Sequence, residues 1–313
     1  MDCKAFVLLG PTASGKSDLA LRLAQRLPAE IVSLDSALIY RKMDIGTAKP
    51  AAEERARVPH HLIDVADPTD TYSAASFVAD CVRLCREISA RGRLPLIAGG
   101  TMMYFHALTG GLSDLPQADG ETRRILQGIC EAEGLEGLYR RLQKADAATA
   151  ARLQPGDKQR IGRALEIFML TGKPMSVHLA ERQSRPAPLA TYTLALFPQD
   201  RERLHGDIAR RFDLMLAQGF LDEVRGLKEA FPALTGEHNS MRCVGYRQAW
   251  NYLAGRCTYD EFKEGAVAAT RQLAKRQLTW LRKLPADLRA DPYGGDIFPT
   301  ALDAAERFFN EAG

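Results

Sequence analysis

The chain has 313 residues, of which 46% are hydrophobic and 26% are charged, a composition typical of a soluble globular protein. This length allows one large core, or a core with a smaller second domain, and no run of eighteen apolar residues is present to span a membrane. The N-terminus lacks the layout of a signal peptide, so we expect a cytoplasmic protein, and the net charge of +3 is too small to indicate a nucleic-acid partner by itself.

The first hundred residues alternate between short apolar runs and amphipathic segments. The apolar runs predict strands at 4–9, 30–34 and 94–98, and the 3.6-residue periodicity predicts helices at 17–27 and 77–90. Strands that alternate with helices in units of this size are typical of a parallel sheet with helices on both faces.

The pattern changes after a connector rich in Pro, Gly and Asp at 112–120. From 121 to about 182 the periodicity is helical throughout, whereas 191–196 alternates like a strand. Most of 201–283 is again helical, apart from a loop around 232–241.

These elements predict an α/β fold with two parts. We expect a parallel-sheet core of the P-loop NTPase type, with a helical C-terminal part, from residues 1–113 and 191–313. Residues 114–190 are expected to form an all-helical insertion domain.

Metal-binding patterns are weak in this sequence. His60 and His61 are adjacent and lack an evident third ligand, so we expect a structural role for them. The cysteines lack paired-ligand spacing and are expected to be reduced thiols rather than zinc ligands or disulfides: Cys3, Cys81, Cys85, Cys130, Cys243 and Cys257.

Positive charge is concentrated near the C-terminus. Residues 241–289 contain ten basic and four acidic side chains, an excess of six positive charges, so the remainder of the chain carries about −3. This asymmetry favours a polyanionic partner, although a solvated helix face is an equal alternative from this feature alone.

A phosphate-binding loop follows the first predicted strand directly. The segment GPTASGKS matches G-x-x-x-x-G-K-[ST] between a strand and a helix, which is the context that the motif requires. Its backbone N–H groups and the positive end of the next helix favour a bound phosphate. The binding residues expected here are Gly10, Pro11, Thr12, Ala13, Ser14, Gly15, Lys16 and Ser17, the last as a Mg²⁺ ligand.

The usual carboxylate of a nucleotide hydrolase is missing downstream. An NTPase normally has an apolar strand that ends in Asp, but the strand at 94–98 leads into Gly99-Gly100-Thr101. Asp35 instead closes the second strand, at the sheet edge where ligands of open α/β sheets bind. The loop therefore indicates phosphate binding without the equipment for splitting ATP.

Seven segments together resemble the bacterial tRNA dimethylallyltransferases, in the family's order and over almost the whole chain. They are GPTASGKS (10–17), DSALIYRKMDIGTAKP (35–50), PHHLIDVADPTDTYSAASF (59–77), AGGTMMYFHAL (98–108), QRIGRALEIF (159–168), RCVGYRQAW (242–250) and RQLAKRQLTWLR (271–282). The insertion and the last thirty residues match only loosely.

The resemblance implies transfer of a dimethylallyl group from dimethylallyl diphosphate to N6 of the adenosine on the 3′ side of the tRNA anticodon. The phosphate loop would then hold the allylic diphosphate, with Mg²⁺, instead of ATP. The partners implied are the tRNA anticodon loop and dimethylallyl diphosphate, with no membrane, and we expect a monomer.

The resemblance also implies roles for four residues. Asp35 would be the general base for the adenine amine, because a weakly nucleophilic amine benefits from losing a proton as the bond forms. Arg160 and Arg211 would reach the departing diphosphate, and Thr101 would contact the adenosine. A capping Asp, arginines in surface ion pairs and a turn hydroxyl are the structural alternatives.

Four stretches correspond to tRNA-contacting stretches of the family, and the target base is expected to leave its stack. In one of them Arg271, Lys275, Thr279 and Arg282 share a basic helix face. The expected contacts are Asp35, Ser36, Ala37, Leu38, Thr101, Arg123, Gln159, Arg160, Ile161, Gly162, Arg163, Arg242, Cys243, Val244, Gly245, Tyr246, Arg247, Lys275, Arg276, Gln277, Leu278, Thr279, Trp280, Leu281 and Arg282.

Three other functions are weighed against this one: a small-molecule kinase with a phosphate loop, a prenyltransferase that acts on free AMP, and an RNA-binding protein without activity. The basic region at 242–282 and the insertion are not needed for AMP, and intact Lys16, Ser17 and Asp35 argue against a loss of activity. Trp280 is expected in the core in preference to a base-stacking position.

Overall fold

The structure is a computed structural model that describes residues 3–110, 115–116, 119–181 and 187–310. The chain divides into two compact units, one formed by Met1–Thr109 with Ala187–Gly313 and the other by Gly110–Pro186. Much of the connector expected at 112–120 lies outside the described residues.

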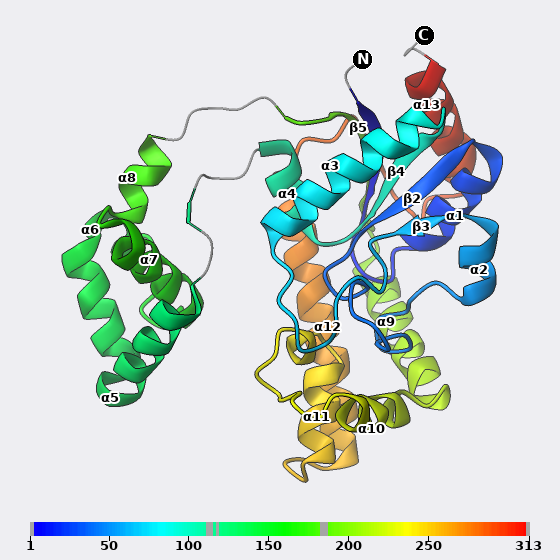
Figure 1. Cartoon of the computed structure of the whole chain (residues 1–313). Helices are drawn as coiled ribbons and strands as arrows, with labels where there is room; N and C mark the ends of the chain where they lie inside the picture. Colours follow the sequence, from blue (N-terminus) through cyan, green and yellow to red (C-terminus); the bar gives the residue numbers. More distant parts are fainter. Residues whose placement is uncertain (1–2, 111–114, 117–118, 182–186, 311–313) are drawn as a thin grey trace. The chain divides into compact units, whose positions relative to one another are not determined.

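The first unit is built on a six-stranded parallel sheet with the order β3-β2-β4-β1-β5-β6 (Figure 1). The four central strands confirm the predicted ones, and they are mainly apolar because helices cover both faces. Two short strands at the edges were not predicted. The strands are β1 (Lys4–Leu9), β2 (Ala29–Leu34), β3 (His60–His61), β4 (Leu94–Gly99), β5 (Ala190–Leu196) and β6 (Leu288–Ala290).

Helices lie against both faces of this sheet (Figure 1). Residues of α1 (Lys16–Arg26) and α13 (Phe298–Asn310) share one apolar cluster with β1 and β2. Residues of α3 (Ala74–Ala90) and α4 (Met102–Gly110) belong to the cluster on the other face. The short α2 (Ala52–Arg57) has no buried residue, and neither α2 nor α13 was predicted.

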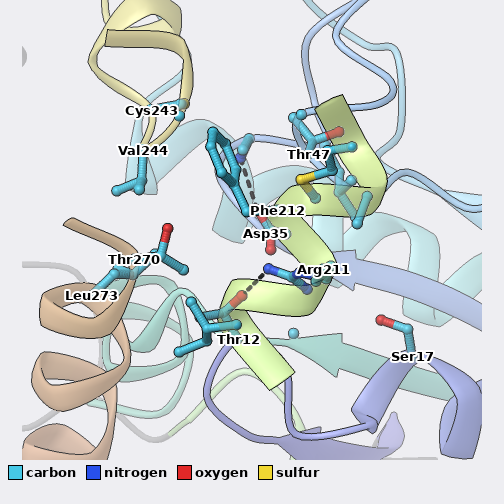
Figure 2. Close-up of a pocket in the computed structure, with 18 of the residues that line it drawn as sticks. Thr12, Ser17, Asp35, Thr47, Arg211, Phe212, Cys243, Val244, Thr270 and Leu273 are labelled. Atoms are coloured by element: carbon cyan, nitrogen blue, oxygen red, sulfur yellow. Dashed lines mark hydrogen bonds between the residues drawn. The ribbon is translucent and has the colours of Figure 1, made fainter. Parts of the chain in front are cut away.

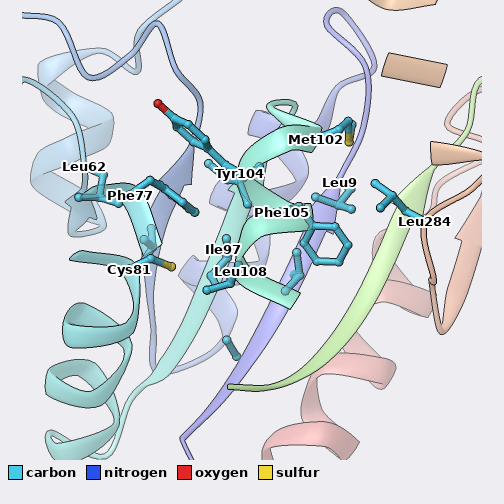
Figure 3. Close-up of a cluster of buried hydrophobic side chains, with 14 of the residues drawn as sticks. Leu9, Leu62, Phe77, Cys81, Ile97, Met102, Tyr104, Phe105, Leu108 and Leu284 are labelled. Carbon is cyan, nitrogen blue, oxygen red and sulfur yellow. The ribbon is translucent and has the colours of Figure 1, made fainter. Parts of the chain in front are cut away.

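The cluster under α3 and α4 fixes the carboxyl ends of the central strands. Phe77 stacks on Tyr104 with ring centroids 4.5 Å apart, and Phe105 is fully buried between Leu9 and the chain near Leu284 (Figure 3). Offset aromatic pairs of this kind add to the free energy of simple burial. This packing holds α3 and α4 against the central strands.

A helical layer follows β5 and carries the basic C-terminal region. It consists of α9 (Arg201–Ala217), α10 (Phe220–Ala230), the 3-10 turn η1 (Ser240–Arg242), α11 (Tyr246–Leu253) and α12 (Tyr259–Leu281). Its core includes Phe220 and Tyr246, whose rings meet edge to face at 5.0 Å. Ile39 and Met43 belong to the same cluster, so the chain after β2 packs on this layer.

The second unit is helical, as expected. It contains α5 (Gly120–Ala145), α6 (Ala147–Ala150), α7 (Lys158–Thr171) and α8 (Met175–Ala180). Gly134 has φ 71° and ψ 179°, which breaks α5 where a break was predicted, and Gly172 ends α7 in the left-handed conformation. Leu126, Leu138 and other apolar residues form a separate small core.

A buried carboxylate holds the first described residues of this second unit in place. Glu166 accepts hydrogen bonds from the Asp119 N–H at 3.1 Å, from Arg123 Nε at 3.0 Å and from Arg163 Nη1 at 2.6 Å. Arg163 also donates to the Pro116 carbonyl. No helix in the described residues is long and apolar enough to cross a membrane.

Candidate active site

The phosphate loop connects β1 to α1 and curls around an open centre. Gly15 has φ 76°, a conformation that costs glycine little, and Ala13 adopts φ 62° in spite of its side chain. Ser14 Oγ donates to the Pro11 carbonyl at 2.8 Å, which closes the curl from inside. Strained backbone of this kind is characteristic of functional loops, and concave loops with free N–H groups are suited to binding an anion.

Gln277 of α12 clamps the phosphate loop to the end of β4. Its Oε1 accepts from the Thr12 N–H at 2.9 Å, and its Nε2 donates to the Gly100 carbonyl at 2.9 Å. Both ends of this amide are therefore engaged within the protein. The amide of Gln277 therefore supports the phosphate loop. Gln277 also lines the cavity, and its contact with tRNA stays a prediction.

Lys16 stands half-buried at the start of α1, with Nζ 3.3 Å from the Pro11 carbonyl. Burial lowers the pKa of Lys16 to about 8, the charge of Asp35 opposes this shift, and Arg211 adds to it. A cation that is poorly solvated and stands next to another cation gains much from a bound polyanion. Both charges therefore favour a phosphate group in the loop.

Asp35 and Arg211 reach the same cavity from different elements (Figure 2). Asp35 follows β2 directly, and its Oδ1 accepts from the Ala37 N–H at 2.9 Å. Arg211 projects from α9 and donates through Nη2 to Thr12 Oγ1 of the phosphate loop. Burial lowers the pKa of Arg211, while Asp35 works against that shift. A carboxylate, a lysine and an arginine thus surround one space.

This cavity has a volume of about 150 Å³. Phe212 and Met215 of α9, with Leu273 of α12, supply apolar lining. Two loops supply further walls, one at 46–48 and one at 243–245. The cavity therefore combines a charged end at the phosphate loop with a partly apolar body, as expected for a substrate with a charged and an apolar part.

Cys243 lines this cavity without being a candidate nucleophile. Burial raises the pKa of its thiol to about 12, and the nearby Asp35 raises it further, whereas Arg247 has a weaker opposite effect. The thiol is therefore protonated at neutral pH, and a protonated thiol is a poor nucleophile. Its role in the wall is one of shape.

Thr101 lies near Asp35, but its side chain is hydrogen-bonded to Ser36, the residue after Asp35. Its Oγ1 accepts from the Ser36 N–H at 2.9 Å and donates to Ser36 Oγ at 3.2 Å. The hydroxyl thus ties the end of β4 to the end of β2. It is not among the residues that line the cavity.

In the second unit, the arginines predicted to meet tRNA are paired with carboxylates. Arg160 is exposed and lies 3.3 Å from Asp157, so its guanidinium is available at the surface of that unit. Arg123 and Arg163 hold the buried Glu166, which gives them a structural function. Gln159 and Gly162 lie outside the core of this unit.

Several residues expected at the tRNA have buried side chains. Packed in the core of their own unit, these side chains support the exposed neighbours that are expected to contact tRNA. The buried residues are Ile161, Tyr246, Leu278 and Leu281.

The predicted basic face of α12 is confirmed, since Arg271, Lys275, Thr279 and Arg282 are exposed while Ala274 and the leucines behind it are buried. Arg276, Arg242 and Arg247 are exposed as well.

Trp280 contradicts the expectation of a core position. Its side chain is 42% exposed, and its ring lies 5.8 Å from that of His106 on α4. An exposed indole next to basic residues is suited to stacking on an unpaired base. The helical pattern around it alone did not show which way this ring points.

The histidine pair behaves as expected. His60 Nδ1 lies 2.7 Å from the Val58 carbonyl, and His61 Nε2 lies 2.7 Å from Glu30, on the edge strand β3 and its neighbour β2. Within the described residues, no group of three or more His, Cys, Asp or Glu side chains is arranged to hold a metal ion.

Comparisons with known proteins show which family the chain resembles. The IPP transferase family matches residues 38–284, and the isopentenyl transferase family matches residues 3–64. The chain is 60% identical to the tRNA dimethylallyltransferase of Neisseria meningitidis serogroup B over 98% of both chains. It is 57% identical to that of Paraburkholderia phymatum, over 96% of this chain and 95% of the relative. The chain belongs to the tRNA dimethylallyltransferase family.

Solved structures of this family have the same fold. The tRNA isopentenylpyrophosphate transferase of Bacillus halodurans is 34% identical, with a TM-score of 0.70 over 99% of this chain and 97% of the other. A eukaryotic dimethylallyltransferase described as acting on tRNA is 27% identical, with a TM-score of 0.83 over 98% of this chain and 80% of the other. The P-loop core predicted from sequence is therefore confirmed.

Proposed function

We propose that this member of the family transfers a dimethylallyl group from dimethylallyl diphosphate to N6 of the adenosine on the 3′ side of the tRNA anticodon. The observation that carries the proposal is the position of Asp35 in the cavity that also contains Lys16 and Arg211. A base and a site for an anionic leaving group thus share one space. The strand end that holds the carboxylate of an NTPase holds glycines here.

The reaction requires one bond to form and one to break. The N6 lone pair attacks C1 of the allylic group as the C1–O bond breaks, and the electrons of that bond leave with the diphosphate. Asp35 takes the N6 proton, since no described residue donates a hydrogen bond to its Oδ2. The loop N–H groups, Lys16 and Arg211 stabilise the charge on the diphosphate, and Arg160 is a further candidate.

Mg²⁺ fits the donor chemistry of this site. Ser17 lies in the first turn of α1 and lines the cavity. Its hydroxyl would supply one hard oxygen ligand, while the diphosphate and water would supply the others. A bound Mg²⁺ neutralises part of the diphosphate charge. The absence of a carboxylate cluster in the described part of the chain is consistent with a metal held mainly by its substrate.

The recognition of tRNA rests on the exposed basic side chains of the C-terminal layer. Arg242, Arg247 and the basic face of α12 offer charge to phosphates, while Trp280 offers a stacking surface. Residues 36–38 follow Asp35 directly, and Ser36 is exposed while Ala37 and Leu38 are half-buried, so this segment lies where the acceptor base has to arrive. Arg160 and Gln159 of the helical unit remain candidates for further contacts.

The test supplies labelled dimethylallyl diphosphate and Mg²⁺ to unmodified tRNA and, in parallel, to AMP. Transfer to tRNA is expected. Label that enters only AMP would select the free-nucleotide acceptor, and ATP consumption without transfer would select a kinase.

A substitution tests the proposed base. Asp35→Asn should lower kcat by about 10²- to 10⁴-fold while tRNA affinity changes little, because the amide cannot accept the proton. Asp213→Asn, on α9 and paired at the surface with Lys263, is the matched control and should retain activity. Normal turnover in the Asp35 variant would remove Asp35 from the mechanism.

A further inference from the structure

Glu223, which no sequence motif singled out, is the centre of a hydrogen-bond network behind the cavity. It lies in the first turn of α10, and its carboxylate accepts from three successive backbone N–H groups. Oε2 lies 2.8 Å from the Asp44 nitrogen and 2.6 Å from the Ile45 nitrogen, while Oε1 lies 3.2 Å from the Gly46 nitrogen. Hydrogen bonds to an ionised carboxylate are among the stronger ones in proteins.

The same carboxylate also binds the other wall of the cavity. Tyr246 donates its hydroxyl to Glu223 Oε1 at 2.5 Å, and Tyr246 directly follows the wall residues 243–245. Gly46, whose N–H also donates to Glu223, is itself the first of the wall residues 46–48. Glu223 is not itself among the residues that line the cavity. One side chain outside the cavity therefore joins two of its walls.

These two walls flank the catalytic carboxylate. Figure 2 shows Thr47 on one side of the cavity and Cys243 with Val244 on the other, with Asp35 and Phe212 between them. Thr12 and Ser17 of the phosphate loop lie at the far end in the same view. The separation of the walls thus affects the space at Asp35 more directly than the diphosphate site.

Close packing gives the joined walls little freedom to shift. A Cβ on Gly46 would lie 2.2 Å from Phe220 and 2.7 Å from the Tyr246 ring, so only glycine fits between these rings. The Tyr246 side chain is fully buried. Burial raises the pKa of Tyr246 well above its usual value, and Glu223 raises it further, so its hydroxyl remains a donor at any working pH.

We propose that Glu223 is a positioning residue that fixes the acceptor adenine against Asp35 by setting the distance between the 46–48 and 243–245 walls. This inference rests on the proposed function, since it concerns the acceptor of that reaction. The phosphate loop is held by other contacts, through Gln277 and Arg211, and does not depend on Glu223. The effect of losing Glu223 should therefore fall on turnover and not on the grip on the donor.

The test compares Glu223→Gln with Tyr246→Phe and a control, Glu30→Gln. Glutamine keeps the size of the side chain but loses an acceptor oxygen, so kcat with tRNA should fall about ten- to hundredfold. The dissociation constant for inorganic pyrophosphate should stay within about twofold of wild type. Tyr246→Phe removes only one hydroxyl and should lower kcat less than Glu223→Gln does. The effects of the two substitutions on kcat should not add in the double variant, because both residues belong to one network.

Glu30 is the matched control because it is a buried carboxylate near the start of β2, at the other end of the strand from Asp35, with Arg91 and His61 as partners. Glu30→Gln should lower the unfolding midpoint while kcat per folded molecule stays unchanged. If both Glu223→Gln and Tyr246→Phe kept wild-type kcat, or if pyrophosphate binding fell in parallel with kcat, the positioning role would be refuted. An inactive wild-type protein would instead refute the proposed function.

Discussion

The lowered pKa of Lys16 predicts that binding of the allylic diphosphate weakens within the mildly alkaline range. With a pKa of about 8, Lys16 is about nine-tenths charged near pH 7 and about one-tenth charged near pH 9. If only the charged form binds, the apparent dissociation constant rises about tenfold across this interval. The substrate contributes little, because the second ionisation of a phosphate group has a pKa near 6 and is about nine-tenths complete at pH 7.

Equilibrium titration with dimethylallyl diphosphate, at steps of pH and without Mg²⁺, measures this dependence. Lys16→Arg is the control, because arginine stays charged over the whole interval and should give a flat profile. Circular dichroism at each pH would show that the protein remains folded. A wild-type constant that stays level between about pH 7 and pH 9 would refute the reasoning, since a lysine with an ordinary pKa near 10.4 stays charged there.

Two further predictions concern α12. Gln277→Glu keeps an acceptor for the Thr12 N–H but loses the donor to the Gly100 carbonyl. The free energy of unfolding, measured in denaturant titrations, should therefore fall by about 1–3 kcal/mol. Pyrophosphate should also bind more weakly. Gln272→Glu, exposed on the same helix, should be nearly neutral, and an equal loss in both variants would contradict the clamp. Trp280→Ala should weaken tRNA binding by about 1–3 kcal/mol in filter-binding assays without lowering stability, because the ring is exposed. Unchanged tRNA binding would exclude stacking.

The parts of the fold that sequence predicted are those with a local signal. The central strands show as apolar runs because each is covered on both faces, and the breaks at Gly134 and Gly172 show because left-handed backbone favours glycine. β3 and β6 contain two and three residues, too few to carry a period, and their pairing depends on neighbours already in place.

The site divides in the same way. The phosphate loop is one continuous motif, and Asp35 is marked by its position at a strand end. Gln277 and Glu223 were not assigned their supporting roles, because their partners lie 265 and 179 residues away along the chain. Trp280 was predicted wrongly, since periodicity shows that a helix has two faces but not whether a large ring at their border is covered.

The order of strands in the sheet has a consequence for the way this chain folds during synthesis. Lys4 pairs with Ala190, so the ladders of β1 are complete only after β5, which ends at Leu196, has been synthesised. The contacts of the helical unit are much closer in sequence, and domains with local contacts fold fast. The ribosome therefore completes the helical unit while β1 still lacks its neighbour β5. Until β5 is made, β1 is an apolar strand with one unpaired edge, which chaperones protect from aggregation.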